Sequence, residues 1–371
     1  MEPVTLFLCG DVMIGRGIDQ VLPHSVEPVL HEPYVKDARR YVRIAEEASG
    51  PISEEVDYAY PWGAALAEIE RRGPTHRVVN LETSLTAEGE PWPDKGIHYR
   101  SHPENVAVLG AAGVDACSLA NNHVLDWGYQ GLEATLRALD RAGIRATGAG
   151  LDVAAAEAPV VLQSRATCGS ATSRRVLVFS VGAMSSGIPP AWAATDSRAG
   201  VAFLREISTE AARDLAARIA DVRRPHDLVV VSIHWGGNWG YTIPDRQRDF
   251  ARRLIDEGGV DVVHGHSSHH PKGIEVHSER LILYGCGDFL NDYEGIGGHE
   301  EVRPDLVLMY FPALDPQTGA LRGMVMTPMR IRTFRLERAS RDDAAWLAEV
   351  LERESLGTGI VSREDGRLEV G

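Results

Sequence analysis

Short runs of apolar residues recur along the whole chain, each four to eight residues long and rich in Val, Ile and Leu. Most of these runs are almost unbroken instead of alternating apolar with polar residues, which is typical of strands that are covered on both faces. We therefore predict strands at residues 4–8, 77–81, 114–119, 159–162, 175–181, 227–234, 260–264, 280–285 and 305–311.

Between several of these runs, apolar residues recur every three to four positions, as on one face of a helix. These segments predict helices at residues 131–143, 210–222 and 244–258. Strands that alternate with helices in this way indicate the α/β fold class. A further helix is predicted at 337–357, where Asp342 and Asp343 suit the first turn and Gly357 suits the end.

Residues 20–75 have a different composition, rich in Pro, His, Tyr and acidic residues, with a charged helical stretch at 36–48. We interpret this segment as an insertion near the functional site, either a cover for the substrate or a solvated addition. The predicted organisation is one main domain over residues 1–335, which includes the insertion, followed by a C-terminal helix and tail at 336–371.

Composition narrows the classes of function. With 44% hydrophobic residues in 371, the chain can bury a large core, and its formal net charge of -15 would repel nucleic acid. No stretch approaches the roughly 18 apolar residues of a membrane span, and residues 1–17 contain no apolar run long enough for a signal peptide. We therefore expect a cytoplasmic protein that binds neither nucleic acid nor membrane.

The four cysteines are far apart in the sequence and form no CxxC pair, which argues against a zinc knuckle and against a disulfide framework. They are Cys9, Cys117, Cys168 and Cys286. We expect them to be buried, reduced thiols.

Polar side chains stand where five of the predicted strands end. They are Asp11, Glu82, Asn122 with His123, His234, and His266 with His269. In an α/β sheet such strand ends meet at one rim, where functional loops lie. Carboxylates, an amide and imidazoles are ligands that Mn, Fe and Zn accept, and the absence of thiolates disfavours a structural zinc site. The pattern therefore predicts a metal centre.

Taken singly, most of these residues also have a structural interpretation. Asp11 could belong to a turn or cap a helix, and Glu82 could begin a helix. His234 closes an apolar run, where a lone histidine is usually a core residue. The segment 118–132 is more specific, because the adjacent Asn121, Asn122 and His123 it contains would contribute little to packing.

Four histidines lie within residues 264–271, and a chance surface cluster is the alternative to a metal site there. Not all four can be ligands. His264 is still inside an apolar run and is expected to be a core histidine. His270 precedes Pro271 and is expected to face solvent.

Six motifs in order resemble those of the capsule-synthesis family called CapA, which includes poly-γ-glutamate biosynthesis proteins and is similar to the calcineurin-like metallophosphoesterases. They are GDVMIGRG (10–17), NLETSLT (80–86), ANNHVLDWGYQGL (120–132), SIHWGGNW (232–239), VVHGHSSHHPKGIEV (262–276) and LYGCGDFLND (283–292). The resemblance covers about residues 4–311. It implies a four-layer αββα sandwich.

The resemblance also implies a site with two divalent metal ions. Asp11 and His269 would hold the first ion, and Glu82 would bridge the two. The second ion would be held by Asn122, His234 and His266. His123 would give a proton to the leaving group, and Asp126 would orient its imidazole.

Three cationic residues near the predicted rim are candidates for holding an anionic substrate: Arg16, Arg100 and Lys272. Each has the alternative of an ordinary surface residue.

The sequence departs from the wider pattern at several positions. Met13 stands where calcineurin-like enzymes have a histidine ligand, and Asn238 stands where the family often has an acidic residue. The segment GHSSHHP replaces GHHPH, and GDF at 287–289 replaces GNF. We expect that the substrate or the metal preference has changed with them.

Three classes of function follow. The first is hydrolysis of a phosphate ester by water that two metal ions activate. The second is a role in the metabolism of poly-γ-glutamate or a related γ-glutamyl amide, with a small anionic or peptide-like substrate. The third is a catalytically silent binding protein, an alternative that Met13 keeps open.

Overall fold

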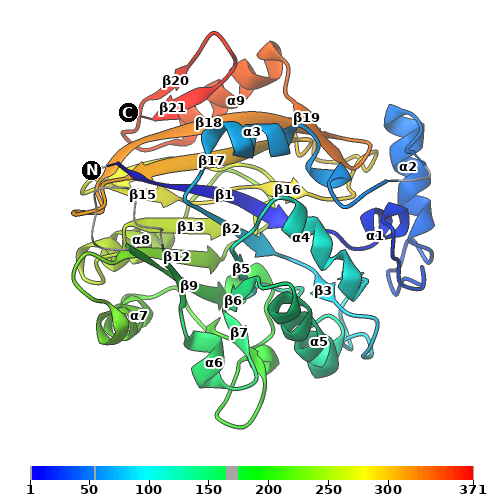
Figure 1. Cartoon of the computed structure of the whole chain (residues 1–371), viewed down its shortest axis with the longest axis horizontal. Coiled ribbons are helices and arrows are strands. Elements are labelled where there is room, and N and C mark those ends of the chain that lie inside the picture. Colours follow the sequence, from blue (N-terminus) through cyan, green and yellow to red (C-terminus); the bar gives the residue numbers. More distant parts are fainter. Residues whose placement is uncertain (1, 54–55, 164–173, 371) are drawn as a thin grey trace.

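The structure is a computed structural model that describes residues 2–53, 56–163 and 174–370. These residues form one sheet of ten strands and one of seven, with helices around them (Figure 1). Two short ribbons and a short helix complete the loops: β3 (Ser84–Leu85) with β4 (Arg100–Ser101), β7 (Ala149–Gly150) with β10 (Gly200–Val201), and α6 (Val153–Glu157).

The first sheet combines a parallel half and an antiparallel half around its first strand. The parallel strands are β1 (Val4–Val12), β2 (His76–Leu81), β5 (Ala116–Ser118) and β6 (Arg145–Thr147). The antiparallel strands are β17 (Leu306–Leu314) and β18 (Leu321–Arg332), with β19 (Arg335–Arg338) pairing with β18. A short strand, β16 (Asp288–Leu290), runs parallel to the end of β1.

The second sheet is mostly parallel. Its parallel strands are β11 (Phe203–Leu204), β9 (Arg175–Ala183), β12 (Leu228–His234), β13 (Val262–His266) and β15 (Arg280–Leu283). Two antiparallel strands pair with its edges: β8 (Val160–Gln163) and β14 (Ile274–His277).

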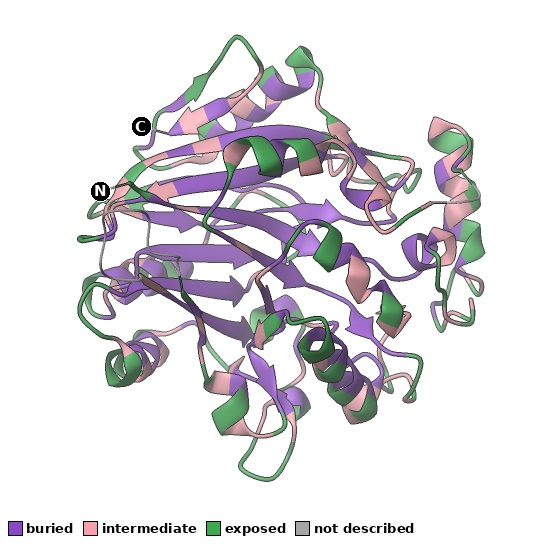
Figure 2. Cartoon of the chain, viewed as in Figure 1, coloured by how far each residue is buried: buried purple, intermediate pink, exposed green. Residues whose placement is uncertain are grey.

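The two sheets pack face to face, and this explains the unbroken apolar runs. Leu6 and Leu8 of β1 share one buried cluster with Val230 of β12, whereas the intervening Phe7 belongs to a second cluster on the opposite face of the first sheet. Successive side chains of a strand point to opposite faces, so both faces must be apolar when both are covered. The burial of the strands is visible in Figure 2.

Helices cover the outer face of each sheet. The buried clusters place α3 (Ala64–Arg72), α4 (Ala107–Ala111) and α5 (Gly128–Arg141) against the first sheet, and α7 (Thr209–Val222) and α8 (Asp245–Asp256) against the second. The predicted α/β class is confirmed. All nine predicted strands and the predicted helices coincide with observed elements. The observed elements α3 and β18 have no counterpart among the predictions.

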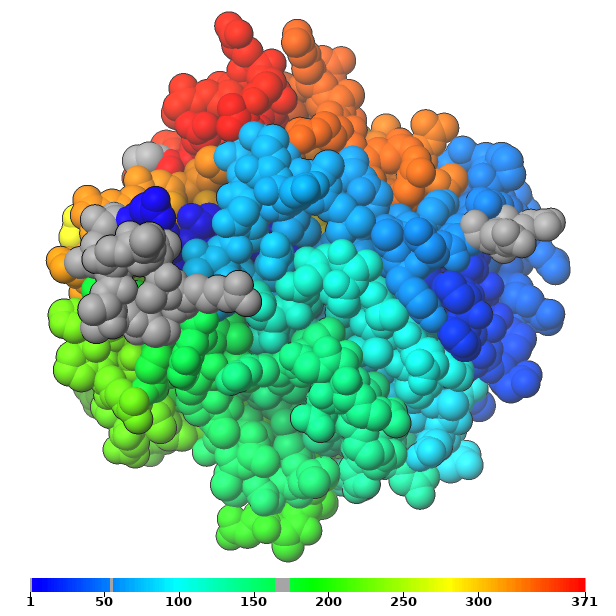
Figure 3. Space-filling view, viewed as in Figure 1, coloured from blue at the N-terminus to red at the C-terminus, as the bar shows by residue number. Residues whose placement is uncertain are grey.

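The segment 20–75 contributes both to the edge of the molecule and to its core. It begins with the end of α1 (Gly17–Val21) and contains α2 (Arg39–Ser49), which lie at the edge of the molecule (Figure 3). Trp62, however, is fully buried, with its ring 6.4 Å from that of Phe7 and 5.7 Å from that of Phe289. The last part of the segment therefore belongs to the main core.

Ser340 caps the start of the C-terminal helix α9 (Arg341–Glu354), and its hydroxyl accepts a hydrogen bond from the amide of Asp343. After the helix, β20 (Ile360–Ser362) and β21 (Leu368–Val370) form a hairpin, and β21 pairs with β18. No helix in the part of the chain that the structure describes is long and apolar enough to span a bilayer.

Candidate metal centre

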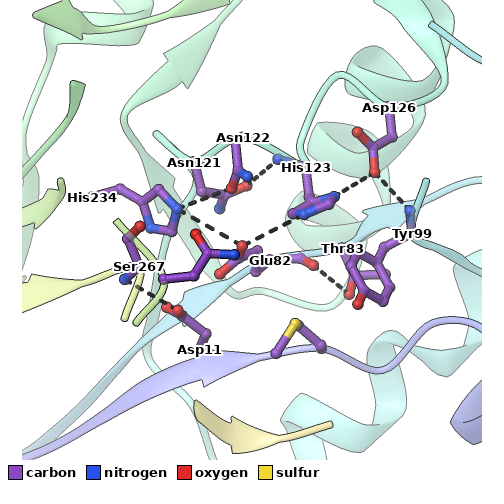
Figure 4. A network of polar contacts seen from close by, with 12 residues as sticks. Asp11, Glu82, Thr83, Tyr99, Asn121, Asn122, His123, Asp126, His234 and Ser267 are labelled. Atoms are coloured by element: carbon purple, nitrogen blue, oxygen red, sulfur yellow. Dashed lines mark hydrogen bonds and ion pairs between the residues drawn. The ribbon is translucent and has the colours of Figure 1, made fainter. Parts of the chain in front are cut away.

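Side chains from both sheets meet at the carboxyl ends of the parallel strands. β1, β2 and the segment after β5 contribute from the first sheet, and β12 and β13 contribute from the second (Figure 4). The residues come from positions scattered between 11 and 266. Their convergence is the condition that the predicted metal centre requires.

The centre of this group is formed by Asp11, His234 and His266. Each offers one ligand atom, and the three atoms lie within 4.8 Å of one another. Nδ1 of His234 is 2.7 Å from Nδ1 of His266, and Oδ1 of Asp11 is 3.8 Å from the latter nitrogen. Two imidazoles and a carboxylate that face one point fit a divalent ion such as Mn, Fe or Zn.

A second layer of contacts fixes this orientation. The hydroxyl of Ser232 lies 2.8 Å from Nε2 of His266, so the other ring nitrogen is directed to the centre. The backbone amide of Ser267 donates to Oδ2 of Asp11 at 3.1 Å, and Ser267 adopts a φ of 100° to do so. A residue other than glycine in this region is strained, and such strain is often found at functional sites.

Glycine at position 10 permits the close approach that presents Asp11. A Cβ there would lie 1.6 Å from the carbonyl oxygen of Gly287, and the amide of Asp11 donates to that same oxygen at 3.0 Å. Any larger residue would push β1 away from the segment that leads into β16.

Two further predicted ligands border the centre. Oδ1 of Asn122 lies 2.9 Å from Nε2 of His234, and Oε1 of Glu82 lies 3.7 Å from the same nitrogen. Glu82 is also linked to Asp11 through Asn80, whose side-chain nitrogen is 2.7 Å from Oδ1 of Asp11 and 3.4 Å from Oε2 of Glu82. Five of the six predicted ligands are thus connected by direct contacts.

The electrostatics of the group favour a cation. Burial and repulsion from Asp288 raise the pKa of Asp11 to about 7, and burial and repulsion from Asp11 raise the pKa of Glu82 well above its usual value. Burial lowers the pKa of both His234 and His266, which leaves neutral imidazoles that each carry one nitrogen lone pair. Buried carboxylates beside neutral imidazoles are stabilised when a metal ion supplies the missing positive charge.

His123 lies beside the centre and is held from its outer side. Nδ1 is 2.7 Å from Oδ2 of Asp126, which also accepts a hydrogen bond from the amide of Tyr99 at 2.6 Å. Nε2 is 3.8 Å from Oε1 of Glu82, so this nitrogen faces the centre. Burial lowers the pKa of His123 to about 4, although the charge of Asp126 opposes this shift.

His269 lies next to the centre but is engaged by other residues. Nδ1 is 2.8 Å from Oδ1 of Asp288, and Nε2 is 2.9 Å from the side-chain nitrogen of Asn238. Asp288 stands opposite Asp11 in the pairing of β16 with β1. Burial alone would lower the pKa of His269, but the neighbouring charge of Asp288 outweighs it and raises the pKa.

Comparison with known proteins identifies the family. A family model described as "Bacterial capsule synthesis protein PGA_cap" matches residues 5–293, well over half of the chain. The chain belongs to this family. A "Probable polyglutamine synthesis accessory protein" of Mycobacterium tuberculosis is 48% identical over 372 aligned positions, which cover 100% of this chain and 96% of the relative.

Two relatives from Bacillus are more distant. The "Capsule biosynthesis protein CapA" of Bacillus anthracis is 30% identical over 78% of this chain and 60% of its own length. The "PGA biosynthesis protein CapA" of Bacillus subtilis is 29% identical over 54% of this chain and 48% of its own length. The resemblance to the CapA family seen in the sequence motifs is therefore confirmed.

Arg16, a predicted substrate-binding residue, does not have a free guanidinium. It is buried and forms ion pairs with Asp292 and, at 2.9 Å, with Glu32. The guanidinium also stacks over the ring of Tyr41 at 4.0 Å. Arg16 therefore connects the residue 20–75 segment to the loop after β16.

The other two predicted substrate-binding residues have different surroundings. The guanidinium of Arg100 lies 3.8 Å over the ring of Trp127, and its NH2 group is 3.4 Å from the carbonyl oxygen of Glu27. Lys272 is buried, and burial lowers its pKa. None of these observations directs Arg100 or Lys272 to the candidate metal centre, and their role in substrate binding stays a prediction.

The other two histidines of residues 264–271 and the three described cysteines are buried. His264 is fully buried between Ser232 and the carbonyl oxygen of Cys9, as expected of a core histidine. His270 is also fully buried, so the expectation that it faces solvent is wrong; Nδ1 lies 3.1 Å from the oxygen of Pro271. The cysteines Cys9, Cys117 and Cys286 are free and buried as predicted, and Cys168 lies outside the described residues.

Three residues of the site are absent from the sequence-based prediction. Asn80 belongs to the NLETSLT motif, and Asp288 is the departure in GDF, so both had a signal in the sequence. Lys95 had none. Its ammonium group contacts Asp126 and the carbonyl oxygen of Asn122, and lies 3.0 Å from Nδ1 of His123.

Proposed function

We propose that this member of the capsule-synthesis family is a metal-dependent hydrolase that acts on a small anionic substrate, most simply a phosphate ester. The observation that carries the proposal is the convergence of Asp11, His234 and His266 within 4.8 Å. With it we propose that the two face-to-face sheets and their outer helices are a calcineurin-like αββα sandwich.

A divalent ion at such a centre supplies an activated water and neutralises charge on a substrate oxygen. The chain supplies the groups around it. His123 presents Nε2 towards the centre, and Asp126 fixes the ring through Nδ1. An anionic leaving oxygen at Nε2 favours the protonated imidazole, which gives that oxygen its proton.

The fit of the residues to a metal rests on their chemistry. Asp11 and Glu82 are buried acceptors, and His234 and His266 are neutral nitrogen donors. The resemblance implies two ions. The metal identity, Mn, Fe or Zn, depends on supply as well as on this ligand set.

The proposal is tested by stripping the protein with a chelator, adding back Mn²⁺, Fe²⁺ or Zn²⁺, and measuring phosphate release from a panel of phosphate monoesters and diesters. Activity should require an added metal and should be lost in His234→Ala. The partly exposed His277, which contacts Asp256 at 2.9 Å, offers the matched control, and His277→Ala should retain activity. No turnover with any metal, or full turnover in His234→Ala, would reject the proposal.

A second candidate follows from the names of the relatives, which concern capsule and polyglutamine synthesis. The same centre would then act in poly-γ-glutamate or γ-glutamyl amide metabolism. Release of glutamate from a γ-linked oligomer, lost in His234→Ala, would favour this candidate. Bound metal without turnover of any ester or amide would instead favour the third class, a silent binding protein.

A further inference from the structure

Asp11 and His269, the donors that the resemblance gives to a first metal ion, have different hydrogen-bond and ion-pair partners. Asp11 is turned towards the predicted ligands of the second ion, because Oδ1 is 3.8 Å from Nδ1 of His266. Its Oδ2 accepts a hydrogen bond from the amide of Ser267 at 3.1 Å. Asp11 therefore shares a centre with His266 and His234, the residues assigned to the second ion.

His269 has no ring nitrogen left for a metal. Nδ1 is 2.8 Å from the carboxylate of Asp288, and Nε2 is 2.9 Å from the side-chain nitrogen of Asn238. The backbone amide of His269 also donates to the carbonyl oxygen of Asn238 at 2.9 Å, which holds the two residues together. An imidazole binds a metal through a nitrogen lone pair. The neighbour of Nε2 in His269 is an amide donor, whereas the neighbours of the His234 ring are other candidate ligand atoms, Oδ1 of Asn122 and Nδ1 of His266.

Position 13 adds no suitable ligand. Met13 is buried, and its sulfur is 3.7 Å from the hydroxyl of Tyr293, which in turn is 2.7 Å from the hydroxyl of Tyr99. A thioether is a soft ligand and suits Cu(I) better than Mn, Fe or Zn. Across residues 2–53, 56–163 and 174–370, one group of three Asp, Glu, His or Cys side chains places its ligand atoms within 4.8 Å, and it is the group around His234.

We propose that this chain binds a single divalent ion, at Asp11, His234 and His266, and that the hydrogen-bonded pair of His269 and Asp288 occupies the position of a second ion. The inference rests on the proposed function, because it requires that a metal binds at all. Glu82 and Asn122 border the single site and complete its ligand set.

The decisive measurement is the metal stoichiometry of the full chain. The metal-stripped protein is titrated with Mn²⁺, the bound ions are counted by native mass spectrometry, and the electron paramagnetic resonance spectrum is recorded. We expect one Mn²⁺ per chain and the six-line spectrum of an isolated ion. Two ions per chain with a spin-coupled spectrum would overturn the inference and leave the proposed function intact. No bound ion would overturn both.

Two variants distinguish the proposed metal site at His266 from the position of His269. His269→Ala should still bind one Mn²⁺ with an affinity within about threefold of the wild type, whereas His266→Ala should bind none. Circular dichroism confirms that each variant is folded, and Asp288→Asn provides a second test of the His269 position if His269→Ala does not fold. Loss of the bound Mn²⁺ in a folded His269→Ala or Asp288→Asn variant would contradict the inference.

Discussion

The carboxylate of Asp126 holds His123 at the ring nitrogen that faces away from the metal centre, with Oδ2 2.7 Å from Nδ1. This arrangement leaves Nε2 directed to Glu82. A carboxylate in this position orients an imidazole and stabilises its charged form. The pair therefore has the geometry of a positioned proton donor.

His123→Ala should lower kcat for a phosphate ester by about 100-fold to 10,000-fold, the range typical of a lost general acid or base. The measurement is a steady-state assay with Mn²⁺, together with metal analysis, which should show unchanged metal content. Asp126→Asn should lower kcat less, because the imidazole stays in place without its charged partner. An unchanged kcat in His123→Ala would show that another group supplies the proton.

Lys95 should contribute strongly to stability through Asp126. Asp126 is fully buried, and removing one partner of a buried charge pair typically costs about 3 kcal/mol or more. We expect Lys95→Met to lower the free energy of unfolding by about 3 kcal/mol, measured by urea denaturation. In the double variant with Asp126→Asn the two losses should not add, because each variant removes the same interaction. Additive losses would mean that the pair is not coupled.

Arg16 should act on stability and not on substrate affinity. Arg16→Met leaves the carboxylates of Asp292 and Glu32 buried without their partner, so the free energy of unfolding should fall by about 3–5 kcal/mol while KM stays unchanged. The matched control is Arg39→Met, which should leave the free energy of unfolding nearly unchanged because its ion pair with Asp37 is exposed to solvent. A raised KM with unchanged stability would instead support the original prediction that Arg16 holds the substrate.

Glu68 should make the protein sensitive to acid. Burial alone would raise the pKa of Glu68, but hydrogen bonds from Arg71, Arg72 and Thr327 outweigh burial and lower it to about 2. A carboxyl whose pKa is lower in the folded state stabilises the fold above its ordinary pKa of about 4.5, and this stabilisation is lost as the pH falls towards 2.

Glu68→Gln should therefore be less stable than the wild type at pH 7. A shift of this size corresponds to about 3 kcal/mol, which we reduce to about 2 kcal/mol because Arg71 and Arg338 are about half exposed and water screens their charges. Urea denaturation between pH 7 and pH 2 should show the difference shrinking below pH 4.5. A difference that does not depend on pH would point to packing as its cause.

The strands and the convergence of Asp11, His234 and His266 were predictable from the sequence for a common reason. Unbroken apolar runs identify strands covered on both faces, and a polar residue at the end of a parallel strand must lie at one rim. His234 ends β12, and His266 ends β13, so the run pattern places both at the rim. The pairing of β12 with β13 then puts them side by side. The strand β18 is not evident in this way, because Gly323 and Pro328 interrupt its apolar residues.

Other parts of the site depend on contacts that no local pattern records. Asp288 reaches the centre because β16 pairs with the end of β1, and that pairing is set by the packing of the whole sheet. Lys95 comes from a loop without periodicity, so its approach to Asp126 follows from the path of the loop. The sequence around Arg16 resembles that of a surface residue. Its burial depends on the ion pair with Asp292, which is distant in the sequence.

The hairpin at the carboxyl end has a practical consequence. β21 covers the outer edge of β18 at Met324–Met326, and Leu368 and Val370 lie in the core between the sheets. A shortened protein that stops after α9 would present the open hydrogen-bonding groups of β18 beside exposed methionines. Bare strand edges of this kind recruit other chains, so such a fragment would aggregate instead of yielding a folded monomer.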